Sequence, residues 1–124
     1  MFHWLIVTLY ALVIFYISNQ PSISFVPENL TYIDPQHLLL HLLEYIPLGL
    51  LIYRAVLKTS FKISVNPIYF STLLGVVYGL SDEIHQYFVP GRTASPLDLA
   101  ADSIGVLIGV FLWKEYRKSS YKKH

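Results

Sequence analysis

The chain contains no cysteine and few charged residues, and both shortages narrow what it can be. Without cysteine, disulfides and thiol chemistry are excluded. Only 14% of the 124 residues are charged, and the net charge of +1 gives no indication of a nucleic-acid partner. By contrast, 54% of the residues are hydrophobic, the mean hydropathy is +0.48, and the aromatic residues include seven Phe and ten Tyr. This composition is rare for a soluble domain and typical of an integral membrane protein.

Four apolar segments are long enough, or nearly so, to cross a bilayer core about 30 Å thick, which requires roughly 20 helical residues. They cover about residues 2–17, 36–57, 67–88 and 96–113, and a polar tail covers 114–124. The first segment lacks a basic leading region and a small-residue cleavage site, so a retained span is expected rather than a signal peptide. Three prolines mark residues 19–35 as a loop. The sequence predicts one all-α domain, a four-helix transmembrane bundle.

The positions of Lys and Arg predict the orientation of this bundle, because positive charge near the ends of spans is retained in the cytoplasm. One basic group, Arg54, Lys58 and Lys62, lies between the second and third spans. The other lies in the tail and consists of Lys114, Arg117, Lys118, Lys122 and Lys123. We therefore expect a multi-pass membrane protein with both termini cytoplasmic, and with the first and third loops on the outer face.

Polar residues gather at the predicted outer ends of spans two, three and four. Positions three or four apart share one face of a helix. In span two, His41 and Glu44 lie on one face with His37, and Tyr45 lies alongside. Pro47, one turn later, interrupts the backbone hydrogen bonds and is expected to bend this helix and open a cavity.

Spans three and four each carry a stripe of small residues that leads into acids. Ser71, Gly75 and Gly79 precede Asp82, Glu83 and Gln86, and Asp98 and Asp102 accompany Ala101, Gly105 and Gly109. Small residues at intervals of four allow membrane helices to approach closely. We expect the two stripes to face each other and the acids to converge at the outer end of the seam. Asp102 lies about 10 Å along its helix from Ser95, so it needs a partner, a proton or a water-filled pocket.

Each of these features also has a purely structural interpretation. Asp98 follows Ser95 and Pro96, and an acid in the first turn commonly stabilises the start of a helix. Arg92 is a candidate to pair with Glu83 or with a lipid phosphate, and His37 is interpreted as an interfacial residue without a role. Five aromatic residues are predicted to lie at the membrane–water interface without a further role: Trp4, Tyr10, Tyr16, Tyr53 and Trp113.

Three motifs in spans two to four resemble a known family. "HLLEY" begins at His41, "DEIHQYFVPGR" spans 82–92 and "SPLDLAADSIG" spans 95–105. They are similar to the VanZ-like family of small bacterial membrane proteins, named for a member associated with resistance to the glycopeptide teicoplanin. Many members carry Phe where this chain has Leu42, and Asn where it has Asp102. The matching positions are His41, Glu44, Tyr45, Asp82, Glu83, Gln86, Arg92, Asp98, Asp102 and Gly105. The resemblance implies a role in the cell envelope and in glycopeptide tolerance.

The polar cluster suits three tasks that the sequence leaves open. The first is hydrolysis or transfer on an envelope lipid or a lipid-linked cell-wall precursor, with a phosphate held by Arg92 and the N-terminus of span four. The second is a divalent metal site, although no HExxH motif is present. The third is a non-catalytic pocket that binds a drug or lipid head group. For the first task, the candidate catalytic residues are His41, Glu44, Asp82, Glu83, His85, Asp98 and Asp102, and the candidate substrate-binding residues are Tyr45, Gln86 and Arg92.

Overall fold

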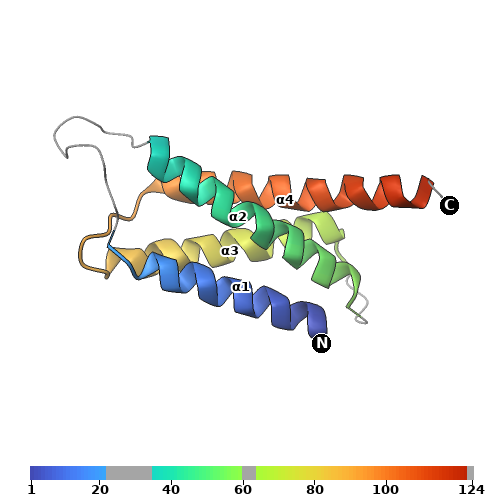
Figure 1. Ribbon diagram of the computed structural model, residues 1–124, viewed down its shortest axis with the longest axis horizontal. Coiled ribbons are helices and arrows are strands. Elements are labelled where there is room, and N and C mark those ends of the chain that lie inside the picture. The colour runs from blue at the N-terminus through green and yellow to red at the C-terminus, as the bar shows by residue number, and fades with distance from the viewer. Residues whose placement is uncertain (22–34, 60–63, 123–124) are drawn as a thin grey trace.

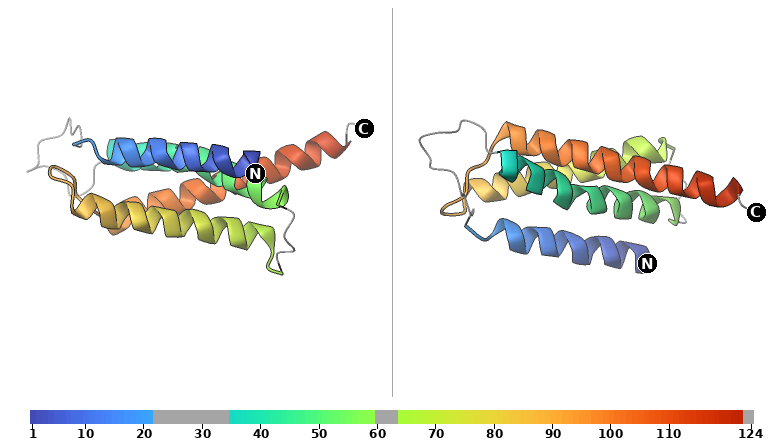
Figure 2. Two further views of the ribbon diagram at one scale, coloured as in Figure 1. Left: turned by 90° about the horizontal axis from the view of Figure 1, so that it is seen from below. Right: turned by 45° about the horizontal axis from the view of Figure 1, so that its top comes forward.

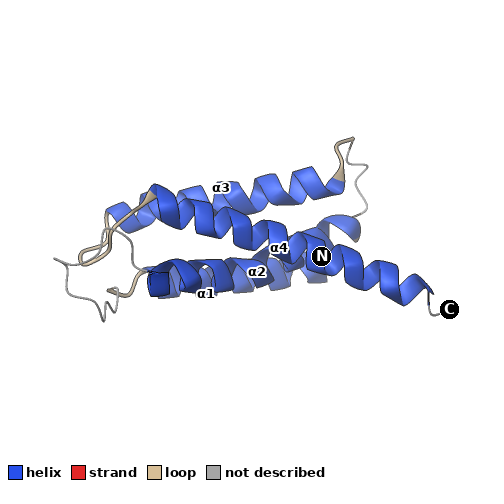
Figure 3. Cartoon of the chain, turned by 90° about the horizontal axis from the view of Figure 1, so that it is seen from above, coloured by secondary structure: helices blue, strands red, loops and turns tan. Residues whose placement is uncertain are grey.

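The computed structural model describes residues 1–21, 35–59 and 64–122, and the elements in these ranges are all helices. They are α1 (Phe2–Ser18), α2 (Pro35–Leu57), α3 (Pro67–Tyr87) and α4 (Pro96–Lys122). The prediction of an all-α fold with four helices is confirmed, and Figure 3 shows the described chain as helices and loops only. Most of the predicted loop at 19–35, together with Lys62 and Lys123, lies outside the described residues.

Proline sets the first residue of three of the four helices, because its fixed φ suits a helix start and its missing N–H costs nothing there. Pro67 follows Asn66, whose side-chain oxygen accepts a hydrogen bond from the backbone of Ile68 at 2.9 Å. In the same way, Ser95 precedes Pro96, and its hydroxyl accepts from the backbone of Leu97 at 3.1 Å. Such caps satisfy N–H groups that have no partner within the helix.

The four helices lie side by side along one long direction, and the two termini lie at the same end of the bundle (Figure 1). The turn between α3 and α4 lies at the opposite end. The contact between α2 and α4 is the most extensive, α3 packs against both, and α1 packs mainly against α2. The two further views in Figure 2 show the C-terminal part of α4 projecting past the other helices. The helix thus continues through most of the polar tail to Lys122.

Glycine allows α2 and α4 to approach almost backbone to backbone. A Cβ at Gly105 would lie 2.6 Å from the carbonyl oxygen of Leu42, and a Cβ at Gly109 would overlap the carbonyl oxygen of Ile46. The prediction that the glycine stripes of spans three and four face each other is therefore wrong for the stripe of α4. Gly105 and Gly109 of α4 instead pack against the backbone of α2. The stripe of α3 does face α4, where Gly75 contacts Val106.

The bundle buries polar side chains beside an apolar core and exposes many apolar side chains on its outer faces. The bundle buries eight polar residues, which are Ser18, His41, Ser71, Asp82, Glu83, Gln86, Asp98 and Asp102. Its outer faces expose Leu, Ile, Val and Phe side chains on every helix, such as Leu9, Leu43, Leu73 and Ile104, each more than half exposed. Extended apolar surfaces of this kind mark contact with lipid or with another protein. By length and composition, α2 and α4 can each cross a membrane, and α1 is a shorter apolar helix.

Two aromatic residues predicted to lie at the membrane interface contribute instead to the packing of the bundle. Tyr53 belongs to the buried core and is 7% exposed. The hydroxyl of Tyr10 donates a hydrogen bond to the backbone carbonyl of Glu44 at 2.9 Å, which joins α1 to α2. The interfacial interpretation is wrong for Tyr53, which is buried inside the bundle. The packing of both residues gave no separate signal, because aromatic residues are common both at protein contacts and at lipid interfaces.

Candidate functional site

The polar cluster forms where α2, α3 and α4 meet near the end of the bundle that holds the α3–α4 turn. His41 of α2 places its Nδ1 atom 2.8 Å from Oδ1 of Asp102 in α4. The same nitrogen lies 4.0 Å from Oε1 of Glu83 in α3. All three residues are buried. When the Asp102 carboxylate is ionised it can only accept, so Nδ1 of His41 then carries a proton, and in the neutral imidazole Nε2 has the free lone pair.

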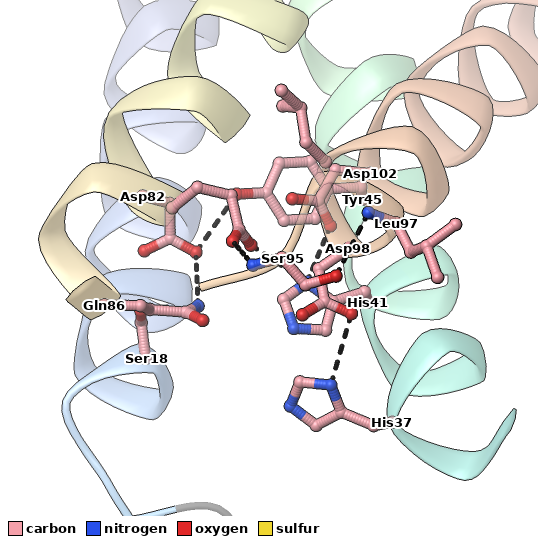
Figure 4. A network of polar contacts seen from close by, with 12 residues as sticks. Ser18, His37, His41, Tyr45, Asp82, Gln86, Ser95, Leu97, Asp98 and Asp102 are labelled. Carbon is pink, nitrogen blue, oxygen red and sulfur yellow. Dashed lines mark hydrogen bonds and ion pairs between the residues drawn. The ribbon is translucent and has the colours of Figure 1, made fainter. Parts of the chain in front are cut away.

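A second histidine extends this cluster toward the N-terminal end of α2. His37 Nδ1 lies 3.3 Å from Oδ1 of Asp98, which is 3% exposed. The rings of His37 and His41 are adjacent, with centroids 4.7 Å apart. Figure 4 shows the Asp98 carboxylate directed toward His37 and the Asp102 carboxylate directed toward His41. His37 therefore contacts a buried acid of the cluster, and its spacing of four from His41 was the signal for this in the sequence.

Asp82 forms a neighbouring group with residues from α2 and α3. Its Oδ2 atom accepts hydrogen bonds from the hydroxyl of Tyr45 at 3.2 Å and from the side-chain amide of Gln86 at 3.1 Å. Tyr45 and Gln86 are almost completely buried. Two neutral donors thus hold this carboxylate in place, and they can reach only one of its two oxygens.

Glu83 connects the cluster to the start of α4. Its Oε2 atom accepts a hydrogen bond from the backbone N–H of Ser95 at 2.9 Å, and its Oε1 atom faces His41. A carboxylate is favourable at this position because helix N-termini attract negative charge. Glu83 therefore occupies part of the N-terminal end of α4 that was predicted to hold a phosphate. The backbone contact with Ser95 gave no signal in the sequence.

Several oxygens of the cluster are buried without a hydrogen-bond partner. They are Oδ1 of Asp82, Oε1 of Glu83, Oε1 of Gln86 and Oδ2 of Asp102. Within the described ranges, none of the four buried acids forms an ion pair with Lys or Arg. Glu83, Asp98 and Asp102 each lie within 4.0 Å of a histidine nitrogen, and a histidine is charged only when it is protonated. Buried carboxylates are costly unless they are paired, protonated or bound to a cation. The cluster therefore contains several buried acids whose negative charge no Lys or Arg neutralises.

Three of the candidate residues lie outside this cluster. Arg92 donates from Nε to the backbone carbonyl of Ser18 at 3.0 Å and forms no ion pair with Glu83 among the described residues, so that predicted pairing is wrong. It caps the C-terminal end of α1, where cations are favourable. His85 faces α1 and contacts Asn19 at 2.8 Å. Glu44 is half-buried, and within the described chain its carboxylate makes no hydrogen bond or ion pair.

An apolar groove with a volume of about 410 Å³ lies beside the cluster, between the outer face of α3 and the start of α4. Glu83 and Ser95 are its polar lining residues. The apolar lining includes Leu80, Ile84, Tyr87, Phe88 and Leu99, several of which are strongly exposed on the surface of the bundle. Glu83 therefore belongs both to the lining of the groove and to the cluster.

Apolar outer faces, a buried polar interior and two helices able to cross a membrane together define a helical membrane protein with an internal acid and histidine cluster. The chain belongs to the VanZ/LLP1 family, whose model matches residues 2–117. The resemblance to the VanZ-like family is thereby confirmed, over nearly the whole chain. No curated protein and no solved structure is a significant match.

Proposed function

We propose that this protein crosses the bacterial cytoplasmic membrane four times, with both termini in the cytoplasm and the polar cluster near the outer surface. The two termini lie at the same end of the bundle, as an even number of crossings requires. Arg54, Lys58 and the basic residues of the α4 tail lie toward that end, and positive charge favours the cytoplasmic side. The exposed apolar side chains on all four helices support lipid contact around the bundle.

In this proposal the protein acts on an envelope lipid or a lipid-linked cell-wall precursor by hydrolysis or group transfer. The observation that carries the proposal is the position of Glu83, which lines the apolar groove with one oxygen directed toward His41 and Asp102. A hydrocarbon chain entering from the bilayer fits the apolar walls of the groove. Its polar head group would then meet the carboxylate.

Proton transfer is the chemistry that this arrangement supports best. A carboxyl group within about 3 Å of a reacting atom can donate or accept a proton, and burial among other acids favours its protonated form. Glu83 is the member of the cluster in the groove lining, so we assign it the proton transfer to the lipid head group. The His41–Asp102 pair lies behind Glu83, with Nδ1 of His41 4.0 Å from Oε1 of Glu83. A proton would pass between them once this distance shortens to hydrogen-bond range or a water bridges it. Tyr45 and Gln86 orient Asp82 beside them.

Comparative lipid analysis tests the enzymatic proposal. Envelope lipids and lipid-linked precursors are quantified by mass spectrometry in cells without the protein and in cells that express wild type, Glu83→Gln or the control Glu115→Gln. Glu115 is exposed on α4, so its substitution makes the same chemical change outside the cluster. We expect a changed pool without the protein, restoration by wild type and Glu115→Gln, and none by Glu83→Gln at equal membrane abundance. Full restoration by Glu83→Gln would refute the role of this carboxyl group.

A second candidate function is non-catalytic binding of a lipid or drug head group, including a contribution to teicoplanin tolerance. It is favoured by the groove itself, whose lining is mostly apolar, and by the hydrogen bond that already joins His41 and Asp102. Filling the groove with Ala94→Trp separates the two functions when tolerance is assayed. A binding protein loses tolerance with Ala94→Trp and retains it with Glu83→Gln, whereas an enzyme loses it with both.

A further inference from the structure

The polar cluster contains more buried acids than basic side chains to pair with them. Asp82, Glu83, Asp98 and Asp102 are each at most 6% exposed. Their ion-pair partners in the described part of the chain are His37 and His41, and Arg92 donates to a backbone carbonyl instead. Burying several carboxylates against two imidazoles is unfavourable unless protons or another cation compensate.

We infer that His37, His41 and Asp98 bind one divalent transition-metal ion, Zn²⁺ or Mn²⁺. One ligand atom from each residue lies within 4.8 Å of the other two. Two ligand atoms held about 2.1 Å from a common ion at a tetrahedral angle are roughly 3.4 Å apart. The Nδ1 atom of His37 and Oδ1 of Asp98 are already 3.3 Å apart. Two imidazoles and one carboxylate form a donor set suited to zinc, with a fourth position left for water or a substrate oxygen.

The environment of His41 is an independent observation that points to a ligand. The residue is 3% exposed, and its Nδ1 atom is held by Asp102 at 2.8 Å. Its other nitrogen, Nε2, has no hydrogen-bond partner among the described residues. A metal-binding histidine almost always directs its second ring nitrogen to a carboxylate or carbonyl, which fixes the ring and selects the nitrogen that binds the metal. Asp102 is then the positioning residue for His41, and not itself a ligand.

A second trio, His41, Glu83 and Asp102, also has ligand atoms within 4.8 Å. In that trio the shortest contact is the hydrogen bond between His41 and Asp102, and one Glu83 oxygen is already bound to the backbone of Ser95. An ion there would have to displace the hydrogen bond between His41 and Asp102. An ion in the first trio keeps that bond intact and replaces only the longer 3.3 Å contact between His37 and Asp98, and for this reason we assign the ion to His37, His41 and Asp98.

Metal binding at this site does not depend on the proposed lipid chemistry. A bound ion would supply a positive charge that attracts a phosphate or polarises a carbonyl oxygen of a head group. Ion binding is measured on the isolated protein, and lipid turnover is measured in cells. The two proposals can therefore fail separately.

The test measures bound metal directly on the full chain, purified in mild detergent through a tag that contains no histidine. The protein is incubated with Zn²⁺ or Mn²⁺, passed over a desalting column and analysed by inductively coupled plasma mass spectrometry. We expect about one ion per chain for wild type, and at least tenfold less for His37→Ala and Asp98→Asn. Asp102→Asn should weaken the affinity by about 10–100-fold, as for other residues that orient a metal ligand.

Two controls make the same chemical changes elsewhere. His3→Ala removes a histidine near the N-terminal end of α1, away from the cluster, and Glu115→Gln neutralises an exposed acid on α4. Both variants should bind metal like wild type. Asp98→Asn preserves side-chain shape and keeps the test valid if His37→Ala does not fold, which size-exclusion chromatography reveals. Less than 0.1 ion per chain in wild type overturns the inference. So does wild-type metal content in both His37→Ala and Asp98→Asn, or loss of metal in Glu83→Gln while His37→Ala retains it.

Discussion

Replacing Gly105 by alanine tests whether the close contact of α4 with α2 sets the geometry of the polar cluster. A Cβ at this position would lie 2.6 Å from the carbonyl oxygen of Leu42 and 3.0 Å from Cβ of Tyr45. Carbon and carbonyl oxygen atoms in favourable contact are about 3.3–3.6 Å apart. The backbone of α2 cannot turn aside as a side chain would, so the two helices must separate locally by about 0.7 Å or more.

The separation acts directly on the cluster, because Gly105 lies one turn after Asp102 and Leu42 follows His41. A 2.8 Å hydrogen bond between His41 and Asp102 would lengthen to about 3.5 Å, beyond the usual range. Loss of a hydrogen bond to a charged group costs about 1.5–3 kcal/mol, and overpacking costs about 1–3 kcal/mol. The better helix propensity of alanine offsets about 1 kcal/mol. We expect Gly105→Ala to lower the free energy of unfolding by about 1.5–5 kcal/mol.

Reversible unfolding by SDS in mixed micelles, followed by circular dichroism, measures this difference. Gly79→Ala is the matched comparison, because its Cβ would meet side-chain atoms of Asp102 and Tyr45, both at 3.3 Å. Side chains adjust by a few tenths of an ångström more easily than a backbone, so the cost should be smaller at Gly79. A Gly105→Ala protein at least as stable as wild type would refute the idea that backbone contact between α2 and α4 positions the cluster.

Three further substitutions test individual contacts. Tyr45→Phe removes the hydroxyl that donates to Asp82, and it should lower the free energy of unfolding by about 1.5–3 kcal/mol in the same SDS titration; an unchanged midpoint would contradict this hydrogen bond. Arg92→Ala removes the donor to the Ser18 carbonyl, so hydrogen exchange should become faster at the C-terminal end of α1, and unaltered exchange there would exclude a capping role. Ser95→Ala removes the side-chain cap of α4 at a cost of about 1 kcal/mol, while its backbone N–H remains available to Glu83, so exchange should accelerate in the first turn of α4 only.

The helix positions could be predicted well from sequence because strong local signals mark them. Pro35, Pro67 and Pro96 each begin a helix, and the apolar segments that follow have the length of a membrane span. The end of α4 could not be predicted in this way. Hydropathy falls at Lys114, which ends an apolar span, but helical hydrogen bonds continue through residues such as Lys, Arg and Glu, which are good helix formers.

The members of the cluster could be predicted in part, because residues four apart on one helix must share a face. The prediction that His41 lies near Glu83 and Asp102 is confirmed, and the structure brings His41 and Asp102 together at 2.8 Å. A glycine stripe shows only that some neighbour comes close, and it does not identify which helix that neighbour belongs to.

Contacts between segments far apart in the chain gave no local signal. The partner of Arg92 is a backbone carbonyl 74 residues earlier, at Ser18. Every residue type offers the same carbonyl, so no pattern of side chains reveals such a contact. The charge of Arg92 suggested an acidic partner because ion pairs are recognisable by residue type, whereas the structure uses the guanidinium to complete the end of a helix.

The tight contact between α2 and α4 has a consequence for how the protein can move. His41 and Asp102 belong to α2 and α4, whose backbones are nearly in contact. Glu83 belongs to α3, which packs less extensively against these two helices. A sideways shift of α3 that widens the groove would carry Glu83 away from the imidazole and leave the distance between His41 and Asp102 unchanged. A large molecule that enters the groove from the bilayer and displaces α3 would therefore weaken the contact between the Glu83 carboxylate and the His41 imidazole.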